Sequence, residues 1–265
     1  MGLTSQSSGL SLLKDKFNIS KKSEEQIVIA LAGNPNTGKS TLFNYLTGLN
    51  QHTGNWPGKT VANAQGSFKY KDKEYLLVDL PGTYSILANS VEEQVARDFI
   101  CFGHPQITIV IADATCLERN LNLVLQIMEI TDNVILCLNL MDEANRKGIK
   151  VQTHKLEKDL GIPVIPMVAR DGVGVHILKD TIEKIVEGEI QPNPYKIQYD
   201  NNIESLVREI TEHLPEYIRE KLNARWIALR LIDGDSSILK SMREFLLINE
   251  SMETEQSGNM SRDDF

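Results

Sequence analysis

A glycine-rich loop between an apolar run and a helical pattern constrains this chain more than any other feature. The apolar run spans 27–32, and the loop reads Gly33-Asn34-Pro35-Asn36-Thr37-Gly38-Lys39-Ser40-Thr41. The spacing G-x-x-x-x-G-K-S/T is typical of a phosphate-binding loop, in which backbone N–H groups and a helix N-terminus surround a polyphosphate. We expect Lys39 to reach the outer phosphates and Ser40 to bind magnesium. The motif therefore predicts a nucleotide-binding domain.

Length and composition limit the class of protein. The chain has 265 residues, 41% of them hydrophobic, which is enough for one large core and a smaller second unit. Its net charge of -8 argues against a nucleic-acid surface, because such surfaces need Lys and Arg to neutralise phosphates. No apolar run approaches the roughly 20 residues that span a bilayer, and the start lacks a secretory signal pattern. We therefore expect a cytoplasmic chain.

Cysteines and histidines give no sign of a metal centre. Cys101, Cys116 and Cys137 are odd in number and lie among apolar residues, so we expect buried, reduced thiols. The five histidines show no spacing typical of metal ligands. We expect neither an iron site nor a zinc site.

Strand and helix patterns alternate from residue 27 to residue 186. Predicted strands cover 27–32, 66–70, 75–79, 107–113, 134–139 and 164–168, and predicted helices cover 39–46, 91–101, 117–130, 154–160 and 175–186. Apolar strands alternating with amphipathic helices indicate a mostly parallel sheet covered on both faces, with its chemistry at the carboxyl ends of the strands. After a linker at 191–194 only helical patterns continue, and Ser236 or Ser237 is expected to cap the last helix.

A second motif, Asp79-Leu80-Pro81-Gly82, ends the third predicted strand. Behind a phosphate loop, Asp79 is placed to hold the magnesium shell and the Gly82 N–H to approach a γ-phosphate. The segment between the two motifs, 49–65, is rich in glycine and polar residues and is interpreted as a long switch loop. We predict that its Thr60 hydroxyl reaches magnesium opposite Ser40.

A third motif, Asn139-Leu140-Met141-Asp142, predicts the base pocket. Guanine presents N1–H and N2–H donors on one edge, and the Asp142 carboxylate can accept both, whereas adenine offers no such pair. Asn139 either ties this pocket to the phosphate loop or meets the base, and Leu140 stands where a lysine is usual. In Val168-Ala169-Arg170 the Ala169 N–H is expected to reach guanine O6, although Val168 replaces the usual serine.

These motifs, in this order at strand ends, predict a translation-factor or Ras-like GTPase domain. The segments Gln51-His52-Thr53-Gly54-Asn55-Trp56-Pro57-Gly58-Lys59-Thr60 and Asp79-Leu80-Pro81-Gly82-Thr83-Tyr84-Ser85 also resemble the N-terminal GTPase domain of the bacterial ferrous-iron transporter FeoB. The segment Leu222-Asn223-Ala224-Arg225-Trp226-Ile227-Ala228-Leu229-Arg230-Leu231 resembles the helical domain that follows it there. The resemblance covers roughly 25–247 and implies an α/β, Ras-like P-loop GTPase three-layer sandwich followed by a small all-α domain.

The motifs and the resemblance together define domains and ligands. We expect an N-terminal extension at 1–24, a GTPase domain at 25–190, a helical domain that restrains GDP release at 195–248, and a disordered polar tail at 249–265. Besides GTP or GDP, the expected cofactors are Mg²⁺ at Ser40, Thr60 and Asp79, and K⁺. The resemblance implies that Asn36 and the carbonyls of Gly54 and Trp56 hold this K⁺. Gly58 and Lys59 are expected beside the nucleotide, and the catalytic centre is expected at Lys39, Asn36, Thr60 and Gly82.

The expected activity is slow GTP hydrolysis stimulated by potassium. Thr83 stands where a glutamine would position the attacking water, and the switch loop offers no arginine finger. The resemblance implies a membrane region of a FeoB-type transporter as partner, a family location in the cell inner membrane with this part facing the cytoplasm, and a possible homo-oligomer. Nucleic acid is not an expected partner.

Two other interpretations stay open. A ribosome-assembly GTPase shares the Asn-Pro-Asn phosphate loop and would bind RNA, but a basic RNA-binding domain is not evident in this acidic sequence. A guanine-nucleotide scaffold would bind GTP and hydrolyse nothing, even with potassium. Turnover in potassium and in sodium separates the second of these from a GTPase.

Overall fold

The computed structural model describes residues 16–19, 21–48, 51–87 and 89–245. One compact unit consists of residues 25–198, and a second consists of residues 199–245 with the described residues before 25. The predicted tail at 249–265 and most of the predicted extension lie outside the described residues. The domain limits predicted at 190 and 195 stay predictions.

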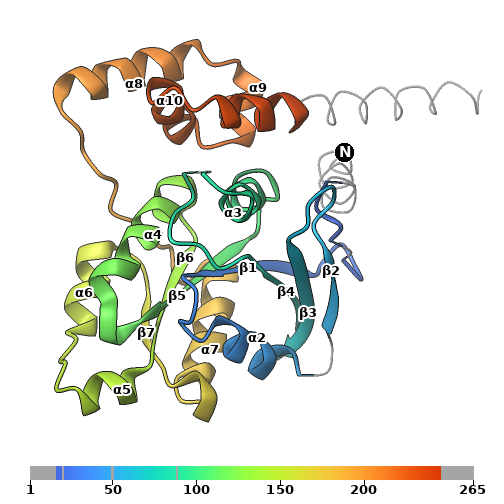
Figure 1. The fold of residues 1–265 in the computed structure, drawn as a ribbon, viewed down its shortest axis with the longest axis vertical. Coiled ribbons are helices and arrows are strands. Elements are labelled where there is room, and N and C mark those ends of the chain that lie inside the picture. The colour runs from blue at the N-terminus through green and yellow to red at the C-terminus, as the bar shows by residue number, and fades with distance from the viewer. Residues whose placement is uncertain (1–15, 20, 49–50, 88, 246–265) are drawn as a thin grey trace, which may run out of the picture. The chain divides into compact units, whose positions relative to one another are not determined.

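The first unit is built on one seven-stranded sheet in the order β2-β3-β4-β1-β5-β6-β7 (Figure 1). Its strands are β1 Ile27–Gly33, β2 Gln51–Asn55, β3 Ala62–Tyr70, β4 Lys73–Asp79, β5 Ile107–Asp113, β6 Val134–Asn139 and β7 Val164–Pro166. The pairs β2–β3 and β3–β4 are antiparallel, and all other neighbours are parallel. Leu31 aligns with Asp79, so β1 and β4 end at the same edge.

Helices cover both faces of this sheet (Figure 1). They are α2 Lys39–Thr47, α3 Val91–Phe102, α4 Leu117–Ile130, α5 Met141–Arg146, α6 Thr153–Leu160 and α7 Val175–Val186, with 3₁₀ turns at Ala114–Cys116 and Ala169–Asp171. α2 and α7 pack on one face, and α3 and α4 lie on the other. The predicted three-layer, mostly parallel α/β arrangement is confirmed.

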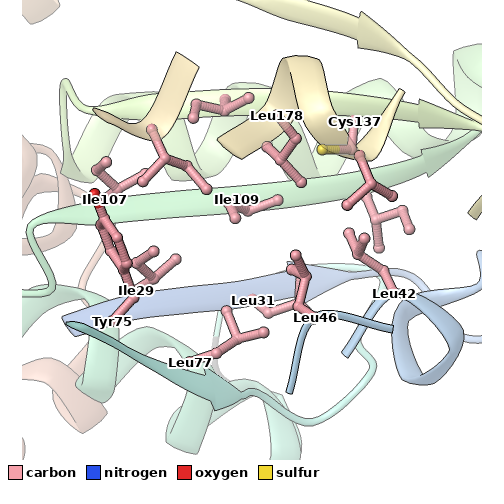
Figure 2. Packing of buried hydrophobic residues seen from close by; sticks show 14 of the residues in the cluster. Ile29, Leu31, Leu42, Leu46, Tyr75, Leu77, Ile107, Ile109, Cys137 and Leu178 are labelled. Atoms are coloured by element: carbon pink, nitrogen blue, oxygen red, sulfur yellow. The ribbon is translucent and has the colours of Figure 1, made fainter. Parts of the chain in front are cut away.

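Alternate strand residues face α2 and α7. Ile29 and Leu31 of β1 and Ile109 of β5 lie in one cluster with Leu42 of α2 and Leu178 of α7 (Figure 2). All five side chains have 0% exposure, and burying a side chain of this kind stabilises a fold by about 1.5–3 kcal/mol. Because the core reaches the ends of the strands, the loops that follow β1 and β4 start from fixed positions.

The structure corrects two expectations about this unit and adds one short helix. The segment 49–65, interpreted as a long loop, contains β2 and the start of β3. β2 is polar and mostly exposed because it is an edge strand, so it carries no alternating apolar pattern. The sequence does not predict the short helix α5. Cys116 was expected to be buried but is exposed, since it lies on the turn between β5 and α4. Cys101 and Cys137 are buried as expected, and all three cysteines are reduced thiols.

The second unit is helical. Its helices are α8 Asn201–His213, α9 Glu216–Lys221 and α10 Ala224–Ile232, and a further helical stretch runs over 236–245. Val207 of α8 packs with Ala228 and Leu229 of α10. Asp235, and not a serine, caps the last stretch by accepting from the Ser237 N–H at 3.0 Å.

An ion pair joins α8 to α10 and makes the stability of this unit depend on pH. Both Glu204 oxygens accept from the Arg225 guanidinium, at 2.7 and 2.8 Å. These bonds, with the Tyr199 N–H, lower the pKa of the Glu204 carboxyl to about 2. A lowered pKa stabilises the fold above the unfolded pKa of about 4.3, and this contribution is lost as pH falls toward 2. Acid unfolding followed by circular dichroism should therefore depend less on pH in Glu204→Gln than in Glu212→Gln, which changes another carboxyl of the same helix.

Candidate nucleotide site

The phosphate loop lies between β1 and α2 at the carboxyl edge of the sheet (Figure 1). A Cβ on Gly33 would lie 2.6 Å from Ile111 Cγ2, so space alone requires a glycine there. Asn36 and Gly38 have φ of 65° and 90°, in the left-handed region that asparagine and glycine tolerate best. Among the described residues, no side chain caps the N-terminus of α2, which leaves its first amide groups available to an anion. The loop fits a polyphosphate.

Asn34 adds a second sign of an anion. Its side chain is buried at 3% exposure, and Nδ2 has no hydrogen-bond partner among the described residues. Its backbone carbonyl accepts from the Thr37 hydroxyl at 2.9 Å, which holds the loop closed. A buried donor costs free energy unless an acceptor meets it, and phosphate oxygens are acceptors of this kind.

Asn139 links the phosphate loop to the base loop. Its Nδ2 donates to the Thr37 carbonyl at 2.9 Å, and its Oδ1 accepts from the Ala169 N–H at 2.9 Å. The side chain is buried at 2% exposure, so both bonds are shielded from water. Of the two predicted roles for Asn139, this geometry matches the tie between the loops. The same bond occupies the Ala169 N–H, so its predicted contact with guanine O6 is not available in this conformation.

Lys39 and Asp79 form an ion pair at the centre of the site. Burial raises the pKa of the Asp79 carboxyl above its ordinary value, and the Lys39 ammonium partly offsets this rise. The Thr83 N–H donates to the Gly33 carbonyl at 3.3 Å, which ties the turn after β4 to the phosphate loop. Gly82 lies beside this loop, since a Cβ there would be 3.5 Å from Pro35. The Asp79 carboxylate and the hydroxyl of the exposed Ser40 are oxygen donors, the type of ligand that a magnesium ion prefers.

Asp142 lies in the first turn of α5, after Leu140, whose φ of 61° turns the chain sharply out of β6. Its Oδ2 accepts from Arg170 Nη2 at 2.8 Å. Its Oδ1 is buried and has no hydrogen-bond partner among the described residues. The Val168 N–H donates to the Val173 carbonyl at 3.1 Å, which closes the base loop on itself. The structure thus brings the predicted base residues to one place.

The predicted switch residues lie on the turn between β2 and β3. Gly58, Lys59 and Thr60 are exposed there, and the Lys59 N–H donates to the Trp56 carbonyl at 3.0 Å. Gly54 of β2 pairs with Asn63 of β3. Three strand spacings of about 4.8 Å each, together roughly 14 Å, separate β2 from β1.

The predicted Thr60 contact to magnesium and the predicted potassium site of Asn36, Gly54 and Trp56 stay predictions. The Trp56 side chain is buried at 2% exposure and makes an edge contact with Phe99 of α3 at 5.6 Å between ring centroids. Sequence reasoning misses Phe99, because it looks like any core residue of an amphipathic helix.

Comparison with known proteins decides the family. The family model of ferrous iron transport protein B matches residues 27–182, which include the phosphate loop, the β4 turn and both base loops. The chain belongs to the ferrous iron transport protein B (FeoB) family. A second model, the FeoB cytosolic helical domain, matches residues 199–260. The resemblance expected from the sequence is confirmed.

Relatives agree in sequence and fold. The Fe(2+) transporter FeoB of Escherichia coli K12 is 38% identical over 216 residues, 80% of this chain and 27% of that protein. The cytosolic domain of L. pneumophila FeoB has a TM-score of 0.75 at 35% identity, over 86% of this chain and 90% of that one. The cytosolic domain of T. maritima FeoB in its GMPPNP form has a TM-score of 0.71 at 37% identity, over 84% and 86%. The predicted Ras-like GTPase fold with a helical domain is confirmed.

The curated FeoB relatives are much longer than this sequence. The chain spans about a quarter of the length of those it matches. Within the part of the chain that the structure describes, every helix is too short or too polar to cross a membrane.

Proposed function

We propose that this FeoB-family chain binds guanine nucleotides and hydrolyses GTP slowly, with potassium as activator, as the cytoplasmic regulatory part of a ferrous-iron transporter. The observation that carries the proposal is the Asn139 side chain, which joins the phosphate loop to the base loop beside Asp142. A ligand that meets both loops would carry a polyphosphate at one end and, beside Asp142, a base with paired donors at the other. The T. maritima relative is known in GDP and GMPPNP forms, which supports the same ligand class here.

The residues of the phosphate side have distinct roles in this proposal. Lys39 turns from Asp79 to the phosphates and offsets charge on their oxygens. Ser40 and Asp79 would hold magnesium, which supplies positive charge to the β- and γ-phosphates when bound. Thr83 is buried at 5% exposure and its N–H is bonded to Gly33, so it cannot orient an attacking water from this position. This position of Thr83 supports the proposal that intrinsic hydrolysis is slow.

Potassium activation depends on the β2–β3 turn lying against the phosphate loop. In our proposal, the carbonyls of Gly54 and Trp56 approach Asn36 and complete a cation site where charge develops between the β- and γ-phosphates. The edge contact between the Trp56 and Phe99 rings fixes the start of this turn against α3. The closed turn would also bring Gly58, Lys59 and Thr60 to the nucleotide.

We expect GTP turnover to be at least tenfold faster in potassium than in sodium, and Asn36→Gly to abolish this difference. Glycine accepts the φ of 65° at this position, so the variant removes the side chain without straining the loop. GDP affinity should change less than twofold, because the cation acts mainly on charge that develops in the reaction. Phosphate release in the two salts measures the effect, with Asn145→Ala on α5 as the control. A full potassium response in Asn36→Gly would contradict the proposed cation site.

The alternatives predict other results in the same assay. A guanine-nucleotide scaffold would bind GDP and release no phosphate in either salt. A ribosome-assembly GTPase would bind RNA, against which the net charge of -8 argues. The partner we propose is the membrane region of a FeoB-type transporter. Self-association and restraint of GDP release by the helical unit remain predictions from the family resemblance.

A further inference from the structure

The two oxygens of the Asp142 carboxylate have different surroundings. Oδ2 accepts from the Arg170 guanidinium at 2.8 Å, whereas Oδ1 is buried without a partner among the described residues. Asp142 lies at the start of α5 and Arg170 in the base loop, 28 positions apart in sequence. A cation therefore engages one of the two acceptors on which guanine recognition depends.

The backbone that carries Arg170 is firmly placed. The residue before it, Ala169, donates its N–H to Asn139 Oδ1. Two residues after it, Gly172 packs against α2 so closely that an added Cβ would lie 2.2 Å from the Tyr45 hydroxyl oxygen. The Arg170 side chain itself is 61% exposed, and Nε also lies 3.4 Å from Asp171 Oδ2. The base loop thus holds the guanidinium near Asp142 while its side chain stays free to swing into solvent.

We propose that Arg170 lowers the preference of the pocket for guanine by competing with the base for Asp142. A guanine base offers two donors along one edge and pairs them with both carboxylate oxygens, so at Oδ2 it competes with the guanidinium for the lone pairs and for the space beside that oxygen. Hypoxanthine lacks the exocyclic amine and has one donor on that edge, so it needs one carboxylate oxygen and leaves the other to the guanidinium. Arg170 therefore weakens guanine binding selectively and narrows the preference for guanine over hypoxanthine. This inference rests on the proposed guanine-nucleotide function.

The size of the effect follows from the exposure of the pair. Exposed ion pairs contribute little, because water and salt screen them and long side chains lose rotamer freedom. The usual free-energy contribution of an exposed ion pair corresponds to a change of about 1.5- to fivefold in an equilibrium constant. Loss of a positive charge also affects a diphosphate, but it affects GDP and inosine diphosphate equally. The ratio of the two affinities therefore isolates competition at the base.

Calorimetric titration of the whole chain with GDP and with inosine diphosphate tests the inference. In Arg170→Ala and Arg170→Gln we expect the affinity ratio of GDP to inosine diphosphate to rise about two- to fivefold over wild type. The matched control is Arg146→Ala, which removes an exposed arginine paired with Glu143 on α5 and changes the net charge equally. It should leave the ratio unchanged.

Other outcomes separate this inference from the proposed function. An unchanged or lower ratio in both Arg170 variants would overturn competition, as would an equal rise in Arg146→Ala. If wild type and Asp142→Asn bind GDP equally, Asp142 does not read the base and the proposed guanine specificity fails with the inference. If Asp142→Asn weakens GDP binding but the Arg170 variants keep the wild-type ratio, only the inference fails.

Discussion

Replacing Asp142 with asparagine is expected to weaken GDP binding about 100-fold and to give the protein a preference for xanthosine diphosphate. Asparagine offers one acceptor and one donor where the carboxylate offers two acceptors, so its amide N–H would face the guanine N2–H. Losing one charge-assisted hydrogen bond and leaving a donor unpaired costs about 3 kcal/mol, or about two orders of magnitude in affinity. Xanthine has a carbonyl at that position and restores a bond. Calorimetric titration with both nucleotides measures the change.

The neighbouring residue Glu143 provides the control for this substitution. Glu143→Gln removes the same charge from the same helix, one position further on, where the carboxylate pairs with Arg146 and not with the base loop. It should leave the base preference unchanged. The guanine assignment would be wrong if Asp142→Asn kept its wild-type GDP affinity, or if both variants shifted preference alike.

Periodicity and spacing predict most of the sheet and the order of its motifs. The strands β1, β5 and β6 are buried on both faces, so their sequences read as continuous apolar runs that few other structures explain. The phosphate loop is equally readable, since Gly33 and Gly38 are fixed by space and by φ. Local chemistry determines these features, and local sequence therefore reveals them.

Features that depend on contacts between distant segments could not be predicted. Asp142 looks like a base ligand in the sequence, but its pairing with Arg170 depends on how two loops meet. Ala169 was expected to face the base, yet its N–H donates to Asn139, 30 positions away. β2 buries no face and so lacks an apolar pattern, and the contact of Trp56 with Phe99 depends on where the sheet edge meets α3.

Gly38→Ala is expected to lower the free energy of unfolding by about 3–4 kcal/mol and to weaken GDP binding more than 100-fold. A Cβ at this position would lie 2.2 Å from Asn139 Nδ2, so the amide must leave its place between Thr37 and Ala169. The left-handed φ of 90° adds about 1–2 kcal/mol for a residue with a Cβ, and each lost bond costs about 1 kcal/mol. Urea unfolding and nucleotide titration measure the two effects.

The clash with Asn139 can be separated from the backbone strain. Gly188 has a φ of 76°, and a Cβ added there would meet nothing within 4 Å, so Gly188→Ala carries strain alone and should cost about 1–2 kcal/mol. Asn139→Ala removes the clashing amide. Adding Gly38→Ala to Asn139→Ala should therefore cost no more than Gly188→Ala does, because the two sites interact through this one contact. Additive losses in the double variant would show that Gly38 is needed for its conformation only, and that Asn139 does not couple the phosphate loop to the base loop.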